Sequence, residues 1–167
     1  MDDTVAERIL SRVFHQLGLP QINMDDFQDR LKYQKLVYLM QNYGLPLGYG
    51  YSWYVRGPYS PELTKTLFNI SNNPSLFTQG RDLKFKNETA VASQIDKFGK
   101  LLGEDLTDPI FLEVLASMVF IKKAYCSKKL GKEDIKKLLL SLKPRLKHEE
   151  NIDTILQKAC SKVPDFN

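Results

Sequence analysis

The side chains with the most chemical potential begin in a segment at residues 32–39. Lys32, Lys35 and Tyr38 recur every three residues, so on a helix they form an oblique ridge, with Gln34 beside them. Their neighbours are apolar, and burying Gln34 and Lys35 costs free energy unless each finds a partner. A buried lysine has a lowered pKa and could serve as a nucleophile or a base. The ridge is therefore a candidate for partner binding, and its alternative role is to hold the fold together.

A second group of candidates follows in residues 53–60, which read Trp-Tyr-Val-Arg-Gly-Pro-Tyr-Ser. Trp, Tyr and Arg are the residue types enriched at binding hot spots. We expect Trp53 to lie in the core. For the others, partner binding and a structural role remain equal alternatives, the second making Gly-Pro only a turn. The partner-binding candidates in this segment are Tyr54, Arg56, Gly57, Pro58 and Tyr59.

The rest of the chain offers little for catalysis. His15 and His148 are isolated, and no Cys or His spacing indicates a zinc site. No Walker loop, dinucleotide glycine motif or nucleophile elbow occurs. Asp25, Asp26 and Asp29 could be imagined around a metal ion, but acidic residues at a helix start need no metal to explain them. We expect no metal and no cofactor.

The segment at residues 32–39, Lys-Tyr-Gln-Lys-Leu-Val-Tyr-Leu, resembles a helix of the Panacea-type antitoxin domains, which include the SocA-like antitoxins. It is also similar to the corresponding helix of the YwgA-like bacterial and archaeal proteins. Both families then carry an aromatic strand ending in Tyr-Gly-Pro and a further helix, as residues 53–63 do here. This chain departs from the pattern at Tyr33, where the families have Leu, and at Arg56, where they have Tyr.

The specific match covers about a fifth of the chain, within the motif region at residues 25–70, and the match beyond it is in layout only. The resemblance implies a compact helical domain with a small β-hairpin. For the antitoxin branch it also implies binding and neutralisation of a protein toxin. The leading hypothesis is a non-catalytic protein–protein interaction module, in a toxin–antitoxin or defence setting. Fold alone does not fix function, so two alternatives stay open. One is a winged-helix-like nucleic-acid-binding protein, and the other is an enzyme with an unrecognised site near Lys35, Tyr38 and Arg56.

Hydrophobic periodicity predicts the elements that must position these residues. A helix apolar on several sides should run from Asp25 or Asp26 to about Tyr43 and occupy the centre. Period-two alternation predicts a strand in residues 49–56, with a turn at Gly57-Pro58 and a second strand at residues 83–86. Residues 71–87 otherwise read as a loop. The other predicted helices span residues 4–17, 61–70, 88–102, 107–125, 132–142 and 149–163.

These elements predict a mainly α fold, a single-domain bundle of about six to seven helices with a small β-hairpin, over residues 1–167. No apolar stretch is long enough to cross a membrane, and residues 1–3 do not open a secretory signal. We expect a cytoplasmic protein. Cys126 and Cys160 should then be separate reduced thiols.

The helical C-terminal region, residues 108–163, is rich in lysine. Residues 120–150 carry ten basic residues against four acidic ones, in a chain of net charge +4. Such a patch could attract nucleic acid, but we favour a solvated lysine-rich helix face, because the run is nearly all lysine and has no interleaved aromatic residue beyond Tyr125. The candidate nucleic-acid contacts are Lys122, Lys123, Lys128, Lys129, Lys132 and Lys136.

Overall fold

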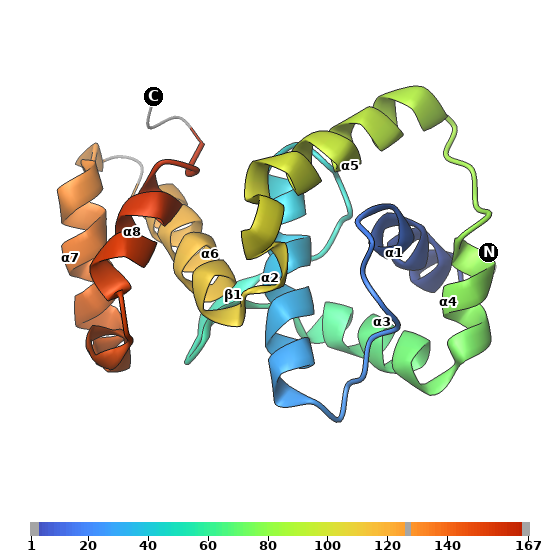
Figure 1. The fold of residues 1–167 in the computed structure, drawn as a ribbon, viewed down its shortest axis with the longest axis horizontal. Helices are drawn as coiled ribbons and strands as arrows, with labels where there is room; N and C mark the ends of the chain where they lie inside the picture. The colour runs from blue at the N-terminus through green and yellow to red at the C-terminus, as the bar shows by residue number, and fades with distance from the viewer. Residues whose placement is uncertain (1–3, 126–127, 165–167) are drawn as a thin grey trace.

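Two long apolar helices, α2 (Phe27–Asn42) and α6 (Pro109–Ala124), pack against each other at the centre of the fold (Figure 1). The structure is a computed structural model that describes residues 4–125 and 128–164. Residues 33–40 of α2 and residues 111–119 of α6 are buried without interruption. A helix buried on all sides must be contacted from several directions. The prediction of a central helix in the motif region is therefore confirmed.

Other helices cover this pair on both sides (Figure 1). One side carries α1 (Val5–Gln16), α3 (Pro61–Asn72) and α4 (Pro74–Gly80). The other side carries α7 (Lys132–Leu142), η3 (Pro144–His148) and α8 (Ile152–Cys160). The remaining helices, α5 (Glu88–Leu102) and η1 (Gly103–Thr107), lead from the first side to the start of α6. The predicted mainly α fold is confirmed.

Three helices begin at polar residues that accept hydrogen bonds from the first helical turn. Asp26 accepts from the Gln28 N–H at 2.8 Å, and Ser60 accepts from the Leu63 N–H at 3.2 Å. Asp108 caps α6 in the same way. Each cap satisfies a backbone donor that has no partner within the helix. These local signals explain why the sequence placed the three helix starts to within two residues.

The small hairpin forms within residues 52–59. Strand β1 (Ser52–Tyr54) pairs antiparallel with β2 (Gly57–Tyr59), and Trp53 lies opposite Pro58. The turn was predicted at Gly57-Pro58, but it falls two residues earlier, at Val55 and Arg56, and Gly57 and Pro58 begin β2. The first strand, predicted to reach residue 56, ends at Tyr54. The physical reason is Gly57, whose φ of +96° closes a tight turn that a residue with a β-carbon adopts only with strain.

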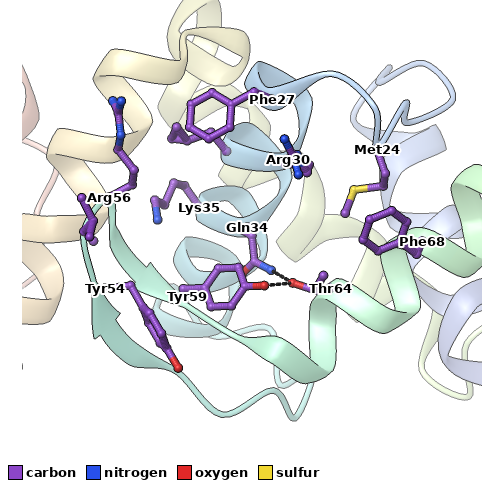
Figure 2. Close-up of a pocket in the computed structure, with 13 residues that line it drawn as sticks. Met24, Phe27, Arg30, Gln34, Lys35, Tyr54, Arg56, Tyr59, Thr64 and Phe68 are labelled. Carbon is purple, nitrogen blue, oxygen red and sulfur yellow. Dashed lines mark hydrogen bonds between the residues drawn. The ribbon is translucent and has the colours of Figure 1, made fainter.

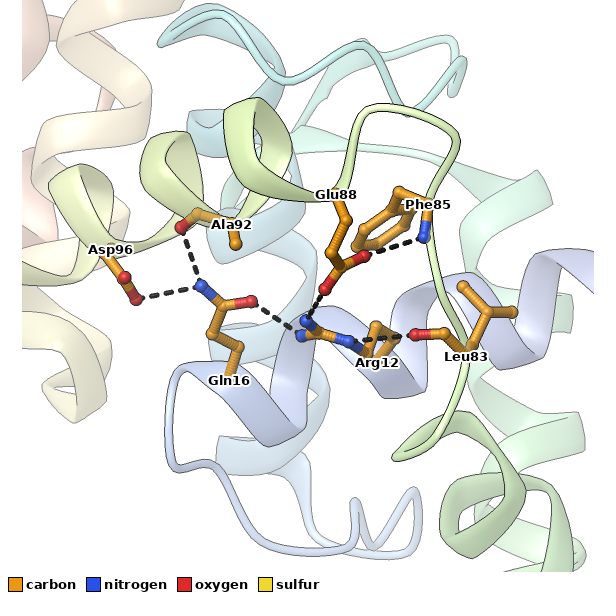
Figure 3. A network of polar contacts seen from close by, with 7 residues as sticks. All are labelled: Arg12, Gln16, Leu83, Phe85, Glu88, Ala92 and Asp96. Atoms are coloured by element: carbon orange, nitrogen blue, oxygen red, sulfur yellow. Dashed lines mark hydrogen bonds and ion pairs between the residues drawn. The ribbon is translucent and has the colours of Figure 1, made fainter.

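Residues 83–86, predicted as the partner strand, are instead a loop held by side chains (Figure 3). The Arg12 Nε donates to the Leu83 carbonyl at 3.1 Å, and the Phe85 N–H donates to Glu88 Oε2 at 2.8 Å. Arg12 also pairs with Glu88 at 2.5 Å and lies 5.4 Å from the centre of the Phe85 ring. Two backbone groups that a strand would use for pairing are therefore satisfied by side chains.

Helix α4 lies inside the predicted loop and was missed. Its proline at the first position is a helix-start signal, but its seven residues are too few to show a helical period. The contact with α1 stabilises it. A β-carbon at Gly80 would come within 2.4 Å of Ser11 Cβ, and His15 Nε2 lies 2.7 Å from the Phe77 carbonyl oxygen.

Among the described residues, no helix combines the length and the apolar character needed to cross a bilayer. Cys160 is a buried free thiol at the end of α8. Cys126 lies outside the described residues.

Candidate functional site

A pocket of about 430 Å³ opens between the first turns of α2, the hairpin and α3. We call it the hairpin pocket. Figure 2 shows Phe27 and Lys35 from α2, Tyr54 and Tyr59 from the hairpin, and Phe68 from α3 around it. Its volume is in the range of sites that hold a small ligand or a few side chains.

One face of α2 forms a wall of the pocket. Phe27, Arg30, Leu31, Gln34 and Lys35 all line it. Their spacing of three, four, seven and eight residues places them on neighbouring turns of the same helix face. The face changes along its length, because Phe27 and Arg30 at the helix start are exposed, whereas Gln34 and Lys35 are buried. The pocket is therefore deepest where the helix passes under the hairpin.

Gln34 joins α2 to the start of α3. Its side-chain carbonyl accepts from the Ser60 N–H at 3.0 Å, and its Nε2 donates to the Ser60 carbonyl at 3.0 Å. This is the two-way exchange that a residue in a neighbouring strand provides. The Nε2 also donates to Thr64 Oγ1 at 2.8 Å, and Thr64 in turn bonds the Tyr59 hydroxyl at 2.7 Å (Figure 2). The buried amide is thus satisfied by the segment that follows the hairpin.

Lys35 is hydrogen-bonded to the second strand of the hairpin. Its side chain is only 2% exposed, and its Nζ donates to the Pro58 carbonyl at 2.6 Å. Burial lowers the pKa of Lys35 to about 7. The positive charges of Lys143, Arg145 and Arg56, in decreasing order, lower the same pKa. Near neutral pH this lysine is therefore close to the midpoint of its titration.

A buried ion cluster lies behind the hairpin. Lys143 Nζ donates to Glu113 Oε1 at 3.0 Å and to the Val55 carbonyl at 2.6 Å, and it lies 5.2 Å from the centre of the Trp53 ring. Arg145 bonds the same oxygen of Glu113. The Glu113 carboxylate on α6 therefore pairs with two cationic side chains from the C-terminal region. The cluster fixes the hairpin turn to α6 and to the end of α7.

Two arginines converge on one exposed aromatic ring at the mouth of the pocket. The guanidinium carbon of Arg30 lies 5.6 Å from the centre of the Phe27 ring, and that of Arg56 lies 5.4 Å from it. Arginine favours such stacking on aromatic faces. Stacking holds both arginines beside Phe27, and their polar edges stay available for hydrogen bonds.

The hairpin pocket brings together six of the nine predicted partner-binding residues: Gln34, Lys35, Tyr54, Arg56, Gly57 and Tyr59. Three others are not among the lining residues. Lys32 pairs with Asp29 at 3.2 Å. Pro58 is the middle residue of β2, and its carbonyl accepts a hydrogen bond from Lys35. Tyr38 lines a separate hollow on the other side of α2, together with Tyr51 and Phe120. The predicted ridge from Lys32 to Tyr38 is therefore not one surface, and the binding role of the nine residues stays a prediction.

Sequence reasoning missed several residues of this region. Phe27 and Arg30 carry a signal that helical spacing could have revealed, because they lie seven and four residues before Gln34. Phe68 on α3 offers no comparable signal. Glu113, Lys143 and Arg145 come together only through packing of the C-terminal helices behind the hairpin.

The predicted nucleic-acid contacts lie around the end of α6 and the start of α7. The six residues are Lys122, Lys123, Lys128, Lys129, Lys132 and Lys136. Three of them bond within the protein: Lys122 to the Pro164 carbonyl, Lys123 to Asn42 Oδ1 at 2.8 Å, and Lys136 to Glu133 at 3.0 Å. Lys123, Lys128, Lys129 and Lys132 are exposed. Their role in binding nucleic acid stays a prediction.

These lysines and the hairpin do not share a surface. The hairpin packs on the first turns of α6, near Glu113, whereas Lys122 and Lys123 are in its last turn. At 1.5 Å per residue, the ten residues between Glu113 and Lys123 span roughly 15 Å. Figure 1 shows the hairpin and the start of α7 at opposite ends of α6.

No protein-family model, curated protein sequence or solved structure matches the chain. The resemblance to the Panacea-type and YwgA-like domains therefore stays a prediction. Over residues 4–125 and 128–164, no three His, Cys, Asp or Glu side chains converge where they could share a metal ion.

Proposed function

We propose that this protein binds another protein, and that the hairpin pocket is its binding site. The observation that carries the proposal is the distribution of exposed apolar side chains. Within the described part of the chain six large apolar residues are exposed, and four of them line this pocket: Phe27, Tyr54, Val55 and Phe68. Apolar groups gathered on one exposed site, with arginines among them, are typical of surfaces that a partner covers.

The frame around the pocket is well supported from inside. Gln34 holds Ser60, Lys35 holds Pro58, and Lys143 holds Val55, so three polar side chains bind main-chain atoms of residues 55–60. A surface held in its binding shape loses less entropy when a partner docks. Neutralisation of a protein toxin is the form of this proposal that the family resemblance supports.

The proposal is tested by capturing the tagged protein from its own host, with and without nuclease and at low and high salt. Partners are identified by mass spectrometry. A double variant, Tyr54→Ser with Phe68→Ser, removes two exposed rings of the pocket and should abolish recovery of the partner. The matched control is Leu142→Ser, because Leu142 is as exposed as Tyr54 but does not line the pocket. Recovery of the same partner by the double variant would contradict the proposal.

Nucleic-acid binding is the second candidate, supported by the four exposed lysines near the end of α6. Neutralisation of phosphates by lysine makes affinity fall steeply with salt. Fluorescence anisotropy with labelled duplex and single-stranded oligonucleotides at low salt measures this directly. Replacing Lys128, Lys129 and Lys132 with glutamine should weaken the binding. No binding at low salt rules this candidate out.

The enzyme alternative has one supporting feature, because Lys35 lines the pocket and has a pKa near neutral. Among the described lining residues, however, there is no carboxylate or histidine to work with it. Its hydrogen bond to the Pro58 carbonyl also gives the lysine a structural role. We therefore take the enzyme alternative no further.

A further inference from the structure

The charge of the hairpin pocket indicates what its partner carries. Of the described residues that line it, the charged ones are Arg30, Lys35 and Arg56, and all three are cations. Phe27 lies between Arg56 and Arg30, and Phe68 lies beyond Arg30 on the α3 side of the pocket (Figure 2). A site with this composition favours a group that is both anionic and attached to an apolar surface.

Within residues 4–125 and 128–164, no carboxylate pairs with Lys35. Its hydrogen-bond acceptor is the neutral carbonyl of Pro58. The nearby buried carboxylate, Glu113, forms its ion pairs with Lys143 and Arg145 instead. A buried cation with a neutral acceptor gains more from an incoming anion than an exposed one, because low polarity strengthens the attraction.

We propose, resting on the protein-binding function above, that the partner inserts a short acidic segment. A Glu or Asp carboxylate of this segment binds between Arg30, Lys35 and Arg56. An apolar side chain beside it packs against Phe27 and Phe68. The two contacts together explain why cations and apolar rings line the same pocket.

The surroundings of the pocket favour a single carboxylate over a polyanion. Asp25 and Asp26 precede Phe27 at the start of α2, and Glu62 lies in the first turn of α3. All three are exposed; Asp25 and Asp26 directly adjoin the lining residues Met24 and Phe27, and Glu62 is two residues before Thr64. They repel an extended phosphate backbone, whereas a compact carboxylate can enter without meeting them.

The Tyr59 hydroxyl adds a further donor. It bonds Thr64 Oγ1 at 2.7 Å, and Thr64 Oγ1 also lies 3.1 Å from the Ser60 carbonyl. When Thr64 directs its single proton to Tyr59, the tyrosine proton is free for an incoming carboxylate. In Figure 2 the hydroxyl lies on the α3 side of the pocket, across from Lys35. A carboxylate bound by both an arginine and this hydroxyl accepts charge-assisted hydrogen bonds from two directions. The two bonds together fix the position of the carboxylate in the pocket.

The proposal is tested with short capped peptides by NMR titration of the ¹⁵N-labelled full chain at pH 7. The probes are acetyl-Gly-Glu-Phe-Gly-amide, the same peptide with Gln for Glu, and the same peptide with Ala for Phe. We expect the first to shift amides of α2, the hairpin and α3. Each substitution in the peptide should weaken binding about tenfold, the equivalent of one lost charge-assisted or apolar contact.

Protein variants assign the contact. Arg30→Gln and Arg56→Gln should each weaken binding of the Glu peptide severalfold and leave binding of the Gln peptide unchanged. The control is Arg81→Gln, an exposed arginine beyond the pocket, which should have no effect. All three arginines are at least partly exposed, so the variants should fold.

Equal binding of the Glu and Gln peptides overturns the carboxylate assignment but leaves protein binding through an apolar pocket intact. No binding of any peptide at about 1 mM overturns the inference, and the capture experiment then decides the proposed function independently. Inorganic phosphate or an oligonucleotide that shifts the pocket amides at lower concentration than the Glu peptide also overturns it. If the Tyr54→Ser, Phe68→Ser protein keeps its partner, the proposed function itself fails.

Discussion

Lys35 is a buried cation whose hydrogen-bond acceptor is a carbonyl oxygen. In an unfolded chain its pKa is 10.5, and in the folded protein it is about 7. Between these values the unfolded state binds more protons than the folded state. The free energy of unfolding therefore rises with pH across this window, while below about pH 7 the full cost of the buried charge remains.

Lys35→Met should flatten this dependence. Lys35 contributes at most about 1.4 kcal/mol per pH unit between pH 7 and 10, and the variant loses that slope. Urea denaturation at several pH values measures it. Burial lowers the pKa of Lys143 to about 7 as well, so this lysine keeps its own part of the pH dependence in both proteins. The difference between the two slopes therefore measures Lys35 together with its repulsion of Lys143. Lys65→Met, at an exposed site on α3, is the control. Parallel curves for wild type and Lys35→Met would show that folding does not lower the pKa of Lys35.

Replacing Gln34 should destabilise the fold, because its side chain bonds the main chain directly after the hairpin. Gln34→Leu leaves both main-chain polar groups of Ser60 without the side chain that bonds them. We expect a loss of about 2–4 kcal/mol, the sum of two buried groups left unsatisfied. Gln28→Leu, exposed on the same helix, should change stability by less than about 0.5 kcal/mol. Chemical denaturation compares the two, and equal effects would contradict the role of the Ser60 contacts.

At the scale of elements, the hairpin depends on Gly57. A β-carbon there would combine a positive φ with an approach of 2.7 Å to Ser117 Oγ. Gly57→Ala should therefore cost about 2–4 kcal/mol, through backbone strain plus a clash. Gly48 has a similar φ of +87° with nothing within 4 Å of its β-carbon position, so Gly48→Ala isolates the strain alone at about 1 kcal/mol. If both variants lose the same stability, the clash contributes nothing.

The elements also show what sequence could and could not predict. The caps at Asp26 and Ser60 and the continuous apolar pattern of α2 are local signals, so the helix boundaries were correct to within a few residues. The loop at residues 83–86 was mistaken for a strand because its side chains alternate between apolar and polar, which is a local signal. Its conformation depends instead on Arg12, which bonds Leu83 from 71 residues away.

The hairpin pocket, likewise, was predicted only where its residues are close together in the sequence. Residues 54–59 stood out by composition, and the structure places most of them around one pocket. Phe68 and the cations behind the hairpin reach that region from other helices, and their arrival depends on packing that no spacing records. Burial of Lys35 was one of two alternatives that the sequence left open, and no spacing indicated its acceptor at Pro58.

At the scale of the molecule, Glu113 links the motif region to the C-terminal helices. Its carboxylate balances Lys143, which holds the hairpin turn, and Arg145, which follows α7. Glu113→Gln leaves a buried cation uncompensated and should cost about 3–5 kcal/mol. Thermal unfolding measures the loss, with Glu133→Gln as the exposed control. Glu113→Gln with Lys143→Met should recover part of the loss, and no recovery would show that the ion pair is not the cause.

The contacts of α1 determine when that helix can dock as the chain is synthesised. Arg12 bonds Leu83 and Glu88, 71 and 76 residues later, and Gln16 bonds Asp96, 80 residues later (Figure 3). These polar contacts must therefore wait for residues 83–96 to leave the ribosome, whereas Phe14 can pack on Tyr33 as soon as α2 is made. Contacts between segments this distant slow folding. In newly made chains α1 is thus held by only part of its contacts until α5 is made, and chaperones that recognise apolar helices can bind it during that interval.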